Sequence, residues 1–339
     1  MKQKHRLPLL LALVAVLAMA IAACGSSDDS SDGGSSAPIT TDQASETTGG
    51  TQTLKVGYVP SIDLGVIKVG EEQGYFEDEG LTLETSPVDS GPNIITGLTS
   101  GQFDIGWVAY APPVLAVGEG NAPLKVVTNS SNQGPDGTNG GVLIRKDSGI
   151  NSWKDLAGKK IATNAPRSLF SLTVPAAIKK DGGDPSGIEL IPLPFTAIGK
   201  AVESGDVDAG VVLEPFGSAA LQQYPDLKDL GDSAAQVFAE GTPTSVYVTS
   251  EKTAEAKADQ IAAFKRAYDK SAEYAKSHLN EVKVAGGELA GLPPAAAKQL
   301  PLAPISTDVT AAQLQPLADK MVEFGWLKEA PDLQGFVGQ

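Results

Sequence analysis

The sequence predicts an α/β fold made of two similar lobes. Short apolar runs alternate with amphipathic or small-residue stretches, which indicates βαβ units and mainly parallel sheets. One stretch of the first half recurs in the second half, which favours a duplicated architecture. Residues 54–337 have a globular composition, and their number suits two lobes at the usual domain size of ~100 to 200 residues.

Strands are predicted where mostly apolar runs are bounded by turn-forming residues. These runs are residues 54–59, 81–85, 103–108, 124–128, 160–163, 188–193, 207–213 and 246–249. After the last run helices are predicted, because Ile261, Phe264 and Tyr268 follow helical spacing, as do Leu314 and Leu317. Such helices need a sheet to pack against, and we expect them to rejoin the first lobe.

The internal repeat joins the end of a helix to a strand. Residues 98–108 (LTSGQFDIGWV) match residues 202–212 (VESGDVDAGVV), and each helix is expected to end at a glycine in the left-handed conformation. A looser echo links residues 55–61 to residues 160–167. A junction of this kind is common and can recur by chance, but two junctions in the same order favour duplicated lobes.

Glycine-containing segments mark the predicted crossings between the lobes. The chain is expected to leave the first lobe near Gly140-Gly141 and to return near residues 241–244. The predicted first lobe therefore comprises residues 54–141 and 243–339, and the predicted second lobe comprises residues 142–242.

The N-terminus predicts export from the cytoplasm. Lys2, Lys4 and Arg6 precede an uncharged run over residues 7–23, which matches a signal peptide over residues 1–23. This run is shorter than the ~20 apolar residues that a membrane span needs. The residues that follow it are rich in Ser, Gly, Asp and Thr and predict a disordered tether over residues 24–53.

Cys24 is the single cysteine of the 339-residue chain, so an intramolecular disulfide is impossible. The stretch Ile21-Ala22-Ala23-Cys24 resembles the lipobox of bacterial lipoproteins, in which the cysteine is acylated and becomes the new N-terminus. The alternative is a chance cysteine in an apolar signal. A lipid anchor on Cys24 is favoured by its position after the uncharged run, by the small residues before it and by the tether after it. Several acyl chains would hold the protein stably at a membrane.

The charge of the chain argues against nucleic acid as a partner. The full sequence has a net charge of −15, and without the three basic residues of the leader 23 Lys and Arg stand against 41 Asp and Glu, a net charge of −18. Binding to phosphates needs clustered basic residues, and no basic stripe follows the leader.

The sequence offers few residues for catalysis. His278 is the one histidine after the leader, so a His/Cys metal cluster is excluded. A Ser-His or Cys-His catalytic pair would have to use this single histidine. The turn at Gly182-Gly183 lacks the Gly-Lys-Ser/Thr of a phosphate-binding loop. We therefore expect no catalytic residue, no metal and no cofactor.

Several stretches together resemble the solute-binding proteins of ABC importers in the nitrate, sulfonate, taurine and pyrimidine-precursor group. They are VGYVP at residues 56–60, EQGYFEDEGL at residues 72–81, SGQFDIG at residues 100–106, IRKDSGI at residues 144–150, DLAGKK at residues 155–160 and EPF at residues 214–216. One departure is Leu213, where this group often has tryptophan.

The resemblance implies a two-lobed fold of the periplasmic-binding-protein type, similar to type II, that closes on its ligand about a hinge. It also implies an extracytoplasmic, lipid-anchored monomer that captures a small solute and delivers it to a permease and its ATPase. Two other functions stay open. Pyrimidine synthases of thiamine-precursor metabolism resemble the same fold, and a sensor could keep the binding fold without transport.

Candidate ligand residues follow the predicted strands, because ligands of parallel α/β sheets lie beyond the carboxyl ends of the strands. The candidates are Ser61, Asp63, Trp107, Ala109, Tyr110, Asn132, Asn164, Arg167, Ser168 and Glu214.

The segment Asn164-Ala165-Pro166-Arg167-Ser168 lies between a strand and a helix, so free N–H groups, the helix dipole and Arg167 could face an anion. The alternative is ordinary capping by Ser168 with Arg167 in solvent. Both readings stay open.

The sequence leaves two roles open for each of Trp107, Tyr110 and Glu214. The two aromatic side chains could stack on a ring or contact an ammonium group, or they could be core residues. Glu214 could pair with a ligand amine, or it could stabilise the start of a helix ahead of Pro215. Arg167 and Glu214 together would suit a zwitterion such as taurine, which is the ligand hypothesis from the sequence.

Overall fold

The computed structural model describes residues 51–135, 137 and 140–338. Two five-stranded sheets form its framework. The predicted signal peptide, Cys24 and most of the predicted tether lie outside the described residues. Among the described residues, no helix combines the length and the apolar character that crossing a membrane requires.

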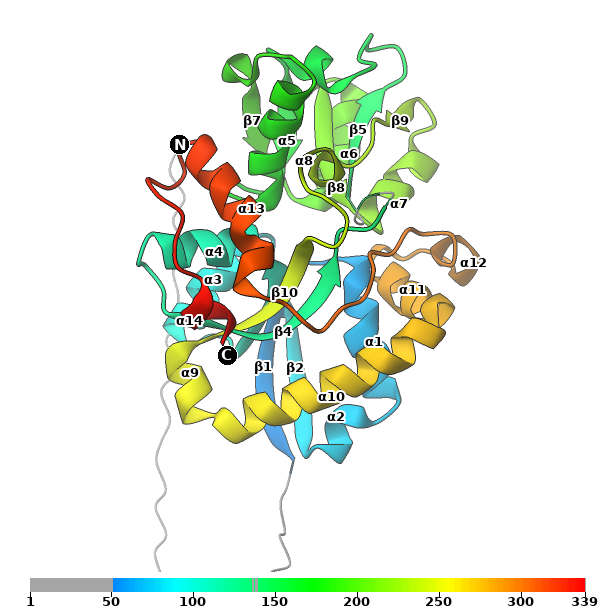
Figure 1. Cartoon of the computed structure of the whole chain (residues 1–339). Coiled ribbons are helices and arrows are strands. Elements are labelled where there is room, and N and C mark those ends of the chain that lie inside the picture. The colour runs from blue at the N-terminus through cyan, green and yellow to red at the C-terminus, as the bar shows by residue number, and fades with distance from the viewer. Residues whose placement is uncertain (1–50, 136, 138–139, 339) are drawn as a thin grey trace, which may run out of the picture. The chain divides into compact units, whose positions relative to one another are not determined.

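The first sheet has the strand order β2-β1-β3-β10-β4. β1 pairs in parallel with β2 and β3, whereas β10 runs antiparallel between β3 and β4. Figure 1 shows β10, in yellow, beside β4, although the two lie far apart in the sequence. The bounds are β1 (Gln52–Tyr58), β2 (Leu81–Pro87), β3 (Ile105–Ala109), β4 (Leu124–Asn132) and β10 (Pro243–Ser250).

The second sheet has the equivalent order β7-β6-β8-β5-β9. β6 pairs in parallel with β7 and β8, and β5 runs antiparallel to both β8 and β9. The bounds are β5 (Gly140–Arg145), β6 (Lys160–Thr163), β7 (Glu189–Pro192), β8 (Ala209–Leu213) and β9 (Leu227–Asp229).

Helices cover the sheets and confirm the α/β prediction. α10 and α11 pack against α1, and α13 contacts both α4 and α5 (Figure 1). The bounds are α1 (Gly65–Glu72), α2 (Tyr75–Asp78), α3 (Gly91–Ser100), α4 (Ala111–Gly118), α5 (Leu169–Lys180), α6 (Phe195–Ser204), α7 (Phe216–Gln223), α8 (Ser233–Val237), α9 (Glu251–Ala256), α10 (Ala258–Ser277), α11 (Leu279–Gly287), α12 (Pro294–Ala297), α13 (Ala311–Glu323) and α14 (Gln334–Val337). Short 3₁₀ turns are η1 (Ile62–Leu64), η2 (Trp153–Leu156), η3 (Pro185–Gly187) and η4 (Glu288–Ala290).

The structure corrects three details of the sequence prediction. The sheets are mixed rather than mainly parallel, because β10 and β5 each enter a sheet in the opposite direction. β5 and β9 were not predicted, since β5 opens on two glycines and β9 has only three residues. β1 begins at Gln52, inside the predicted tether, because the Gln52 N–H donates to the Gly80 carbonyl at 2.7 Å.

The sequence repeat corresponds to α3 with β3 and to α6 with β8. Both helices end at a left-handed glycine as predicted, Gly101 at φ 77° and Gly205 at φ 82°. The N–H of each glycine donates to a carbonyl three residues earlier, which ends the helix and turns the chain into the strand.

An aspartate three residues after each left-handed glycine accepts a hydrogen bond from the backbone of the neighbouring strand. The Asp104 carboxylate accepts a hydrogen bond from the N–H of Lys55 at 3.0 Å, and that of Asp208 accepts one from the N–H of Lys160 at 2.9 Å. The weaker sequence similarity between residues 55–61 and 160–167 thus includes Lys55 and Lys160, whose backbone N–H groups make the same contact in each sheet.

Candidate ligand-binding site

A small cavity of about 50 Å³ lies between elements of the two sheets. A buried water needs roughly 10–15 Å³ of such space, so this cavity suits a ligand of few heavy atoms. The lining is mostly apolar with a few polar groups, as is usual for sites that bind small molecules. The lining residues are Val59, Asp63, Gly91, Trp107, Val108, Ala109, Pro112, Asn164, Ser168, Leu169, Phe170, Phe195, Leu213, Thr244 and Ser245.

Asp63 is the acidic residue of the cavity. It lies in η1, just after β1, and is 3% exposed. Its carboxylate accepts hydrogen bonds from the hydroxyls of Ser131 at 2.9 Å and Ser245 at 3.3 Å. Burial is the main cause that raises the pKa of Asp63 to about 6, and the two hydroxyls oppose this shift because they stabilise the anion.

The hydroxyl groups around Asp63 form a network at the end of the first sheet. The Ser131 and Ser245 oxygens lie 2.6 Å apart, and the Thr244 hydroxyl donates to the Ser131 carbonyl at 3.0 Å. Thr244 and Ser245 belong to β10 and Ser131 to β4, so the pairing of these two strands sets the position of the carboxylate. The network therefore holds the Asp63 side chain at the cavity.

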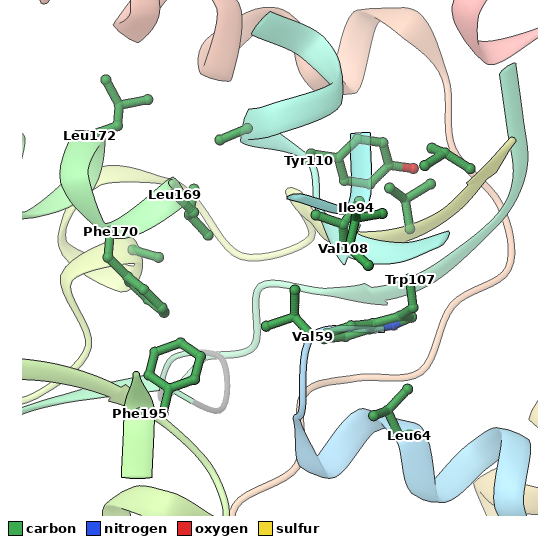
Figure 2. Close-up of a cluster of buried hydrophobic side chains, with 14 of the residues drawn as sticks. Val59, Leu64, Ile94, Trp107, Val108, Tyr110, Leu169, Phe170, Leu172 and Phe195 are labelled. Carbon is green, nitrogen blue, oxygen red and sulfur yellow. The ribbon is translucent and has the colours of Figure 1, made fainter. Parts of the chain in front are cut away.

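Aromatic rings form much of the apolar wall. Trp107 comes from β3, and its indole N–H donates to the Ser130 hydroxyl at 3.0 Å. Figure 2 shows Trp107 close to Val59, with Phe170 and Phe195 on the other side of the view. The rings of Phe170 and Phe195 meet edge to face with their centroids 6.2 Å apart. Phe170 lies in the first turn of α5, and Phe195 lies in the first turn of α6.

Helix N-termini also meet at the cavity. Gly91 begins α3, Leu169 begins α5 and Phe195 begins α6, and all three residues line the cavity. The first N–H groups of a helix have no partner within the helix and carry a partial positive charge. This arrangement favours a negatively charged ligand group without a basic side chain, and no Lys, Arg or His is among the described lining residues.

Five of the predicted ligand residues line the cavity: Asp63, Trp107, Ala109, Asn164 and Ser168. Ser168 also caps α5, because its hydroxyl accepts a hydrogen bond from the Ser171 N–H at 3.4 Å. Ser168 therefore caps the helix and also lines the cavity.

The other five predicted residues are placed away from the cavity lining. Tyr110 is buried among core side chains that include Ile94 and Val108 (Figure 2), and its hydroxyl donates to the Asn129 side chain at 3.1 Å. Asn132 accepts a hydrogen bond from Asn129 at 2.9 Å. Ser61 caps η1, where its hydroxyl accepts from the Asp63 N–H.

Arg167 and Glu214, between which the sequence hypothesis placed a zwitterion, are both outside the lining of this cavity. Arg167 forms an ion pair with Glu119 at the end of α4. The Glu214 carboxylate accepts hydrogen bonds from the N–H of Ser218 at 3.1 Å and from its hydroxyl at 3.0 Å. Glu214 thus stabilises the first turn of α7, the structural role that the sequence left open.

Sequence reasoning missed Thr244, Ser245, Phe170 and Phe195. It searched only the residues that follow strands, whereas β10 is antiparallel and brings its first residues to the carboxyl edge of β3. The phenylalanines lie in the first turns of the helices that follow β6 and β7, not directly after a strand. A search that included helix starts and polar residues opening a strand would have found all four.

The polar side chains of the described cavity lining carry hydroxyls, one amide and one carboxylate. Within the described residues, no group of three or more His, Cys, Asp or Glu side chains is arranged to hold a metal ion. His278 lies far along the chain at the end of α10, where its ring stacks on Tyr274 with the centroids 3.8 Å apart.

Comparison with known proteins places this fold in a family. A family model described as NMT1/THI5 like matches residues 62–281, which is well over half of the chain. A putative aliphatic sulfonates-binding protein of Bacillus subtilis is 26% identical over 67% of this chain and 67% of its own length. The taurine-binding periplasmic protein of Escherichia coli is 33% identical over 61% of this chain, and the match spans 62% of that protein.

A solved structure shows the same fold over most of the chain. The periplasmic aliphatic sulphonate binding protein SsuA from Escherichia coli matches with a TM-score of 0.65 and 22% identity, over 84% of this chain and 97% of SsuA. The predicted resemblance is thus confirmed: this chain belongs to the NMT1/THI5-like family and has the periplasmic-binding-protein fold.

Proposed function

We propose that this protein is the substrate-binding lipoprotein of an ABC importer and captures a small anionic or zwitterionic solute, best described as an aliphatic sulfonate or a taurine-like molecule. The observation that carries the proposal is the cavity, which combines helix N-termini, hydroxyl groups and one buried carboxylate between the two sheets. The relatives named for aliphatic sulfonates and taurine support the same solute class.

The proposal includes the cellular setting of the protein. The solute is bound outside the cytoplasm and delivered to a permease and its ATPase, while acylated Cys24 anchors the protein, a monomer, to the bacterial membrane. The leader sequence, the lipobox-like stretch before Cys24 and the relative named as periplasmic support this setting. Membrane fractionation of cells that express the chain with Cys24→Ala tests the anchor, because the variant should leave the membrane fraction.

We propose binding rather than catalysis as the role of the cavity. The named relatives are binding proteins, and the described lining offers no histidine, cysteine, lysine or arginine to act on a substrate. Nucleophilic or acid–base chemistry near neutral pH relies mainly on those residue types or on a poised carboxyl group. Asp63 is such a carboxyl group, and the hydroxyls beside it, those of Ser131 and Ser245, also contact each other, which suits a network that holds the carboxylate in place.

A thermal-shift screen tests the proposed function. A solute that binds only the native state raises the melting temperature, by a free energy of RT ln(1 + [L]/Kd). The screen compares sulfonates, taurine, nitrate, carboxylates, amino acids and pyrimidines. Stabilisation by taurine or an alkanesulfonate supports the proposal, and stabilisation by pyrimidines alone would contradict it.

A further inference from the structure

We propose that Asp63 and Asn164 form an ammonium subsite, so that the cavity selects solutes that carry a protonated amine over solutes of the same shape that lack one. This inference rests on the proposed function and adds the residues that set specificity. The amine is supplied by the solute, a short zwitterion whose anionic end lies toward the helix N-termini.

Asp63 provides the negative charge of the subsite. The side chain lines the cavity, is almost fully buried, and is held by the hydroxyls of Ser131 and Ser245. These hydroxyls stabilise the carboxylate while it faces the cavity. Removal of a carboxylate from water is costly, and an ammonium group of a bound solute would offset that cost through a charge-assisted hydrogen bond.

Asn164, which follows β6 of the second sheet and lines the cavity, provides a second acceptor. Its side-chain oxygen is buried and has no hydrogen-bond partner among the described residues. Its side-chain nitrogen lies 3.5 Å from the Asp89 carbonyl oxygen. A buried acceptor without a donor costs free energy, so this oxygen is suited to a donor from the solute. An ammonium group has three such donors, enough for both acceptors.

The rest of the lining fits a cation at one end and an anion at the other. The ring of Trp107 offers a face on which an ammonium group gains cation–π attraction. The described lining contributes no Lys, Arg or His side chain, so no positive group of the lining competes with the ammonium group of the solute. The starts of α3, α5 and α6 provide the partial positive charge for a sulfonate or a carboxylate.

Two pairs of matched solutes test the inference on the full chain by isothermal titration calorimetry. Taurine is compared with propane-1-sulfonate, and β-alanine with butyrate; within each pair a methyl group replaces the ammonium group. We expect the amine-bearing member of at least one pair to bind on the order of a hundredfold more tightly, because its analogue brings neither a donor for the Asn164 oxygen nor a positive charge for the Asp63 carboxylate.

Variants assign the preference to the subsite. Asp63→Asn should lower the affinity for the amine-bearing solute at least about tenfold and leave the amine-free analogue nearly unchanged. Asp226→Asn makes the same chemical change at an exposed aspartate and should change neither affinity. Since the wild-type comparison of matched solutes needs no variant, the test holds even where Asp63→Asn fails to fold.

The outcomes separate this inference from the proposed function. Equal or tighter binding of the amine-free member in both pairs overturns the ammonium subsite and leaves the importer role in place. Absence of binding by all four solutes also overturns the subsite, and the importer role then depends on the other solutes of the thermal-shift screen. A preference for taurine that persists in Asp63→Asn overturns the assignment to Asp63.

Discussion

The Ser131 hydroxyl donates to the Asp63 carboxylate at 2.9 Å and so connects the end of β4 to the turn that follows β1. Through Ser245 the same network reaches β10. Three strands from distant parts of the sequence thus hold one buried acidic group at the cavity. The following predictions depend on that group, on the residues around the cavity and on the repeated helix–strand unit.

Asp63 should make the free energy of unfolding depend on pH. Its pKa in the fold is about 6, above the usual 3.8, so the native state keeps a proton that the unfolded chain has lost between pH 4 and 6. The stability contributed by this group therefore falls as pH rises through that range, by roughly 3 kcal/mol in the ligand-free protein. Asp63→Asn should lack this fall.

Urea unfolding of wild type and Asp63→Asn at pH 4.5 and 7.5 measures the difference. The variant should gain stability relative to wild type at the higher pH. An identical pH dependence in both proteins would show that Asp63 keeps an ordinary pKa in the fold.

Glu214 should act on stability rather than on affinity. Glu214→Ala removes two hydrogen bonds to Ser218 at the start of α7 and should cost about 1 kcal/mol, as the loss of a helix cap does. The affinity for taurine should stay within about threefold of wild type, since Glu214 is outside the cavity lining. Thermal melts and calorimetry measure both quantities. A tenfold loss of affinity with an unchanged melting temperature would restore Glu214 as a ligand residue.

The ion pair between Arg167 and Glu119 should contribute little to binding. Both side chains are partly exposed, at 47% and 29%, and such pairs contribute at most about 1 kcal/mol. Arg167→Ala should therefore weaken solute binding less than about fivefold, and Glu119→Ala should have the same effect. A double-mutant cycle with titration calorimetry checks this. A large loss in Arg167→Ala alone would mean that the guanidinium group contacts the anion directly.

Gly106 and Gly210 should be intolerant of a methyl group. A Cβ at Gly106 would lie 2.3 Å from Cγ2 of Ile94, and one at Gly210 would lie 2.2 Å from Cγ2 of Ile198. Each alanine variant should lose about 1–3 kcal/mol through overpacking of the helix on the strand. Gly335→Ala is the matched control, because a Cβ there meets no atom within 4 Å. Chemical denaturation that finds all three variants equally stable would contradict this packing.

The repeat made much of the fold predictable from the sequence. Residues 98–108 and 202–212 repeat a helix end, a left-handed glycine and a buried strand, and the structure forms that unit twice. The directions of β5 and β10 could not be read in the same way, because an apolar run has the same period in a parallel and an antiparallel strand.

The site was predictable only where its residues follow a parallel strand. Asp63 and Asn164 were found by that rule, and Trp107 was found near the end of β3, whereas Thr244 and Ser245 open an antiparallel strand. Side-chain direction was the second limit. Tyr110 follows β3 as closely as expected, yet its ring packs into the core, where Asn129 accepts a hydrogen bond from its hydroxyl. Spacing along the sequence does not reveal such a partner.

Tryptophan fluorescence locates the bound solute. Trp107 lines the cavity, whereas the other two tryptophans, Trp153 and Trp326, are outside its lining. Titration with taurine should change the emission of the wild type and of Trp326→Phe in a saturable way, and Trp107→Phe should lose the change while calorimetry still detects binding. An emission change that persists in Trp107→Phe, or no saturable change in the wild type, would contradict the capture of a taurine-like solute in this cavity.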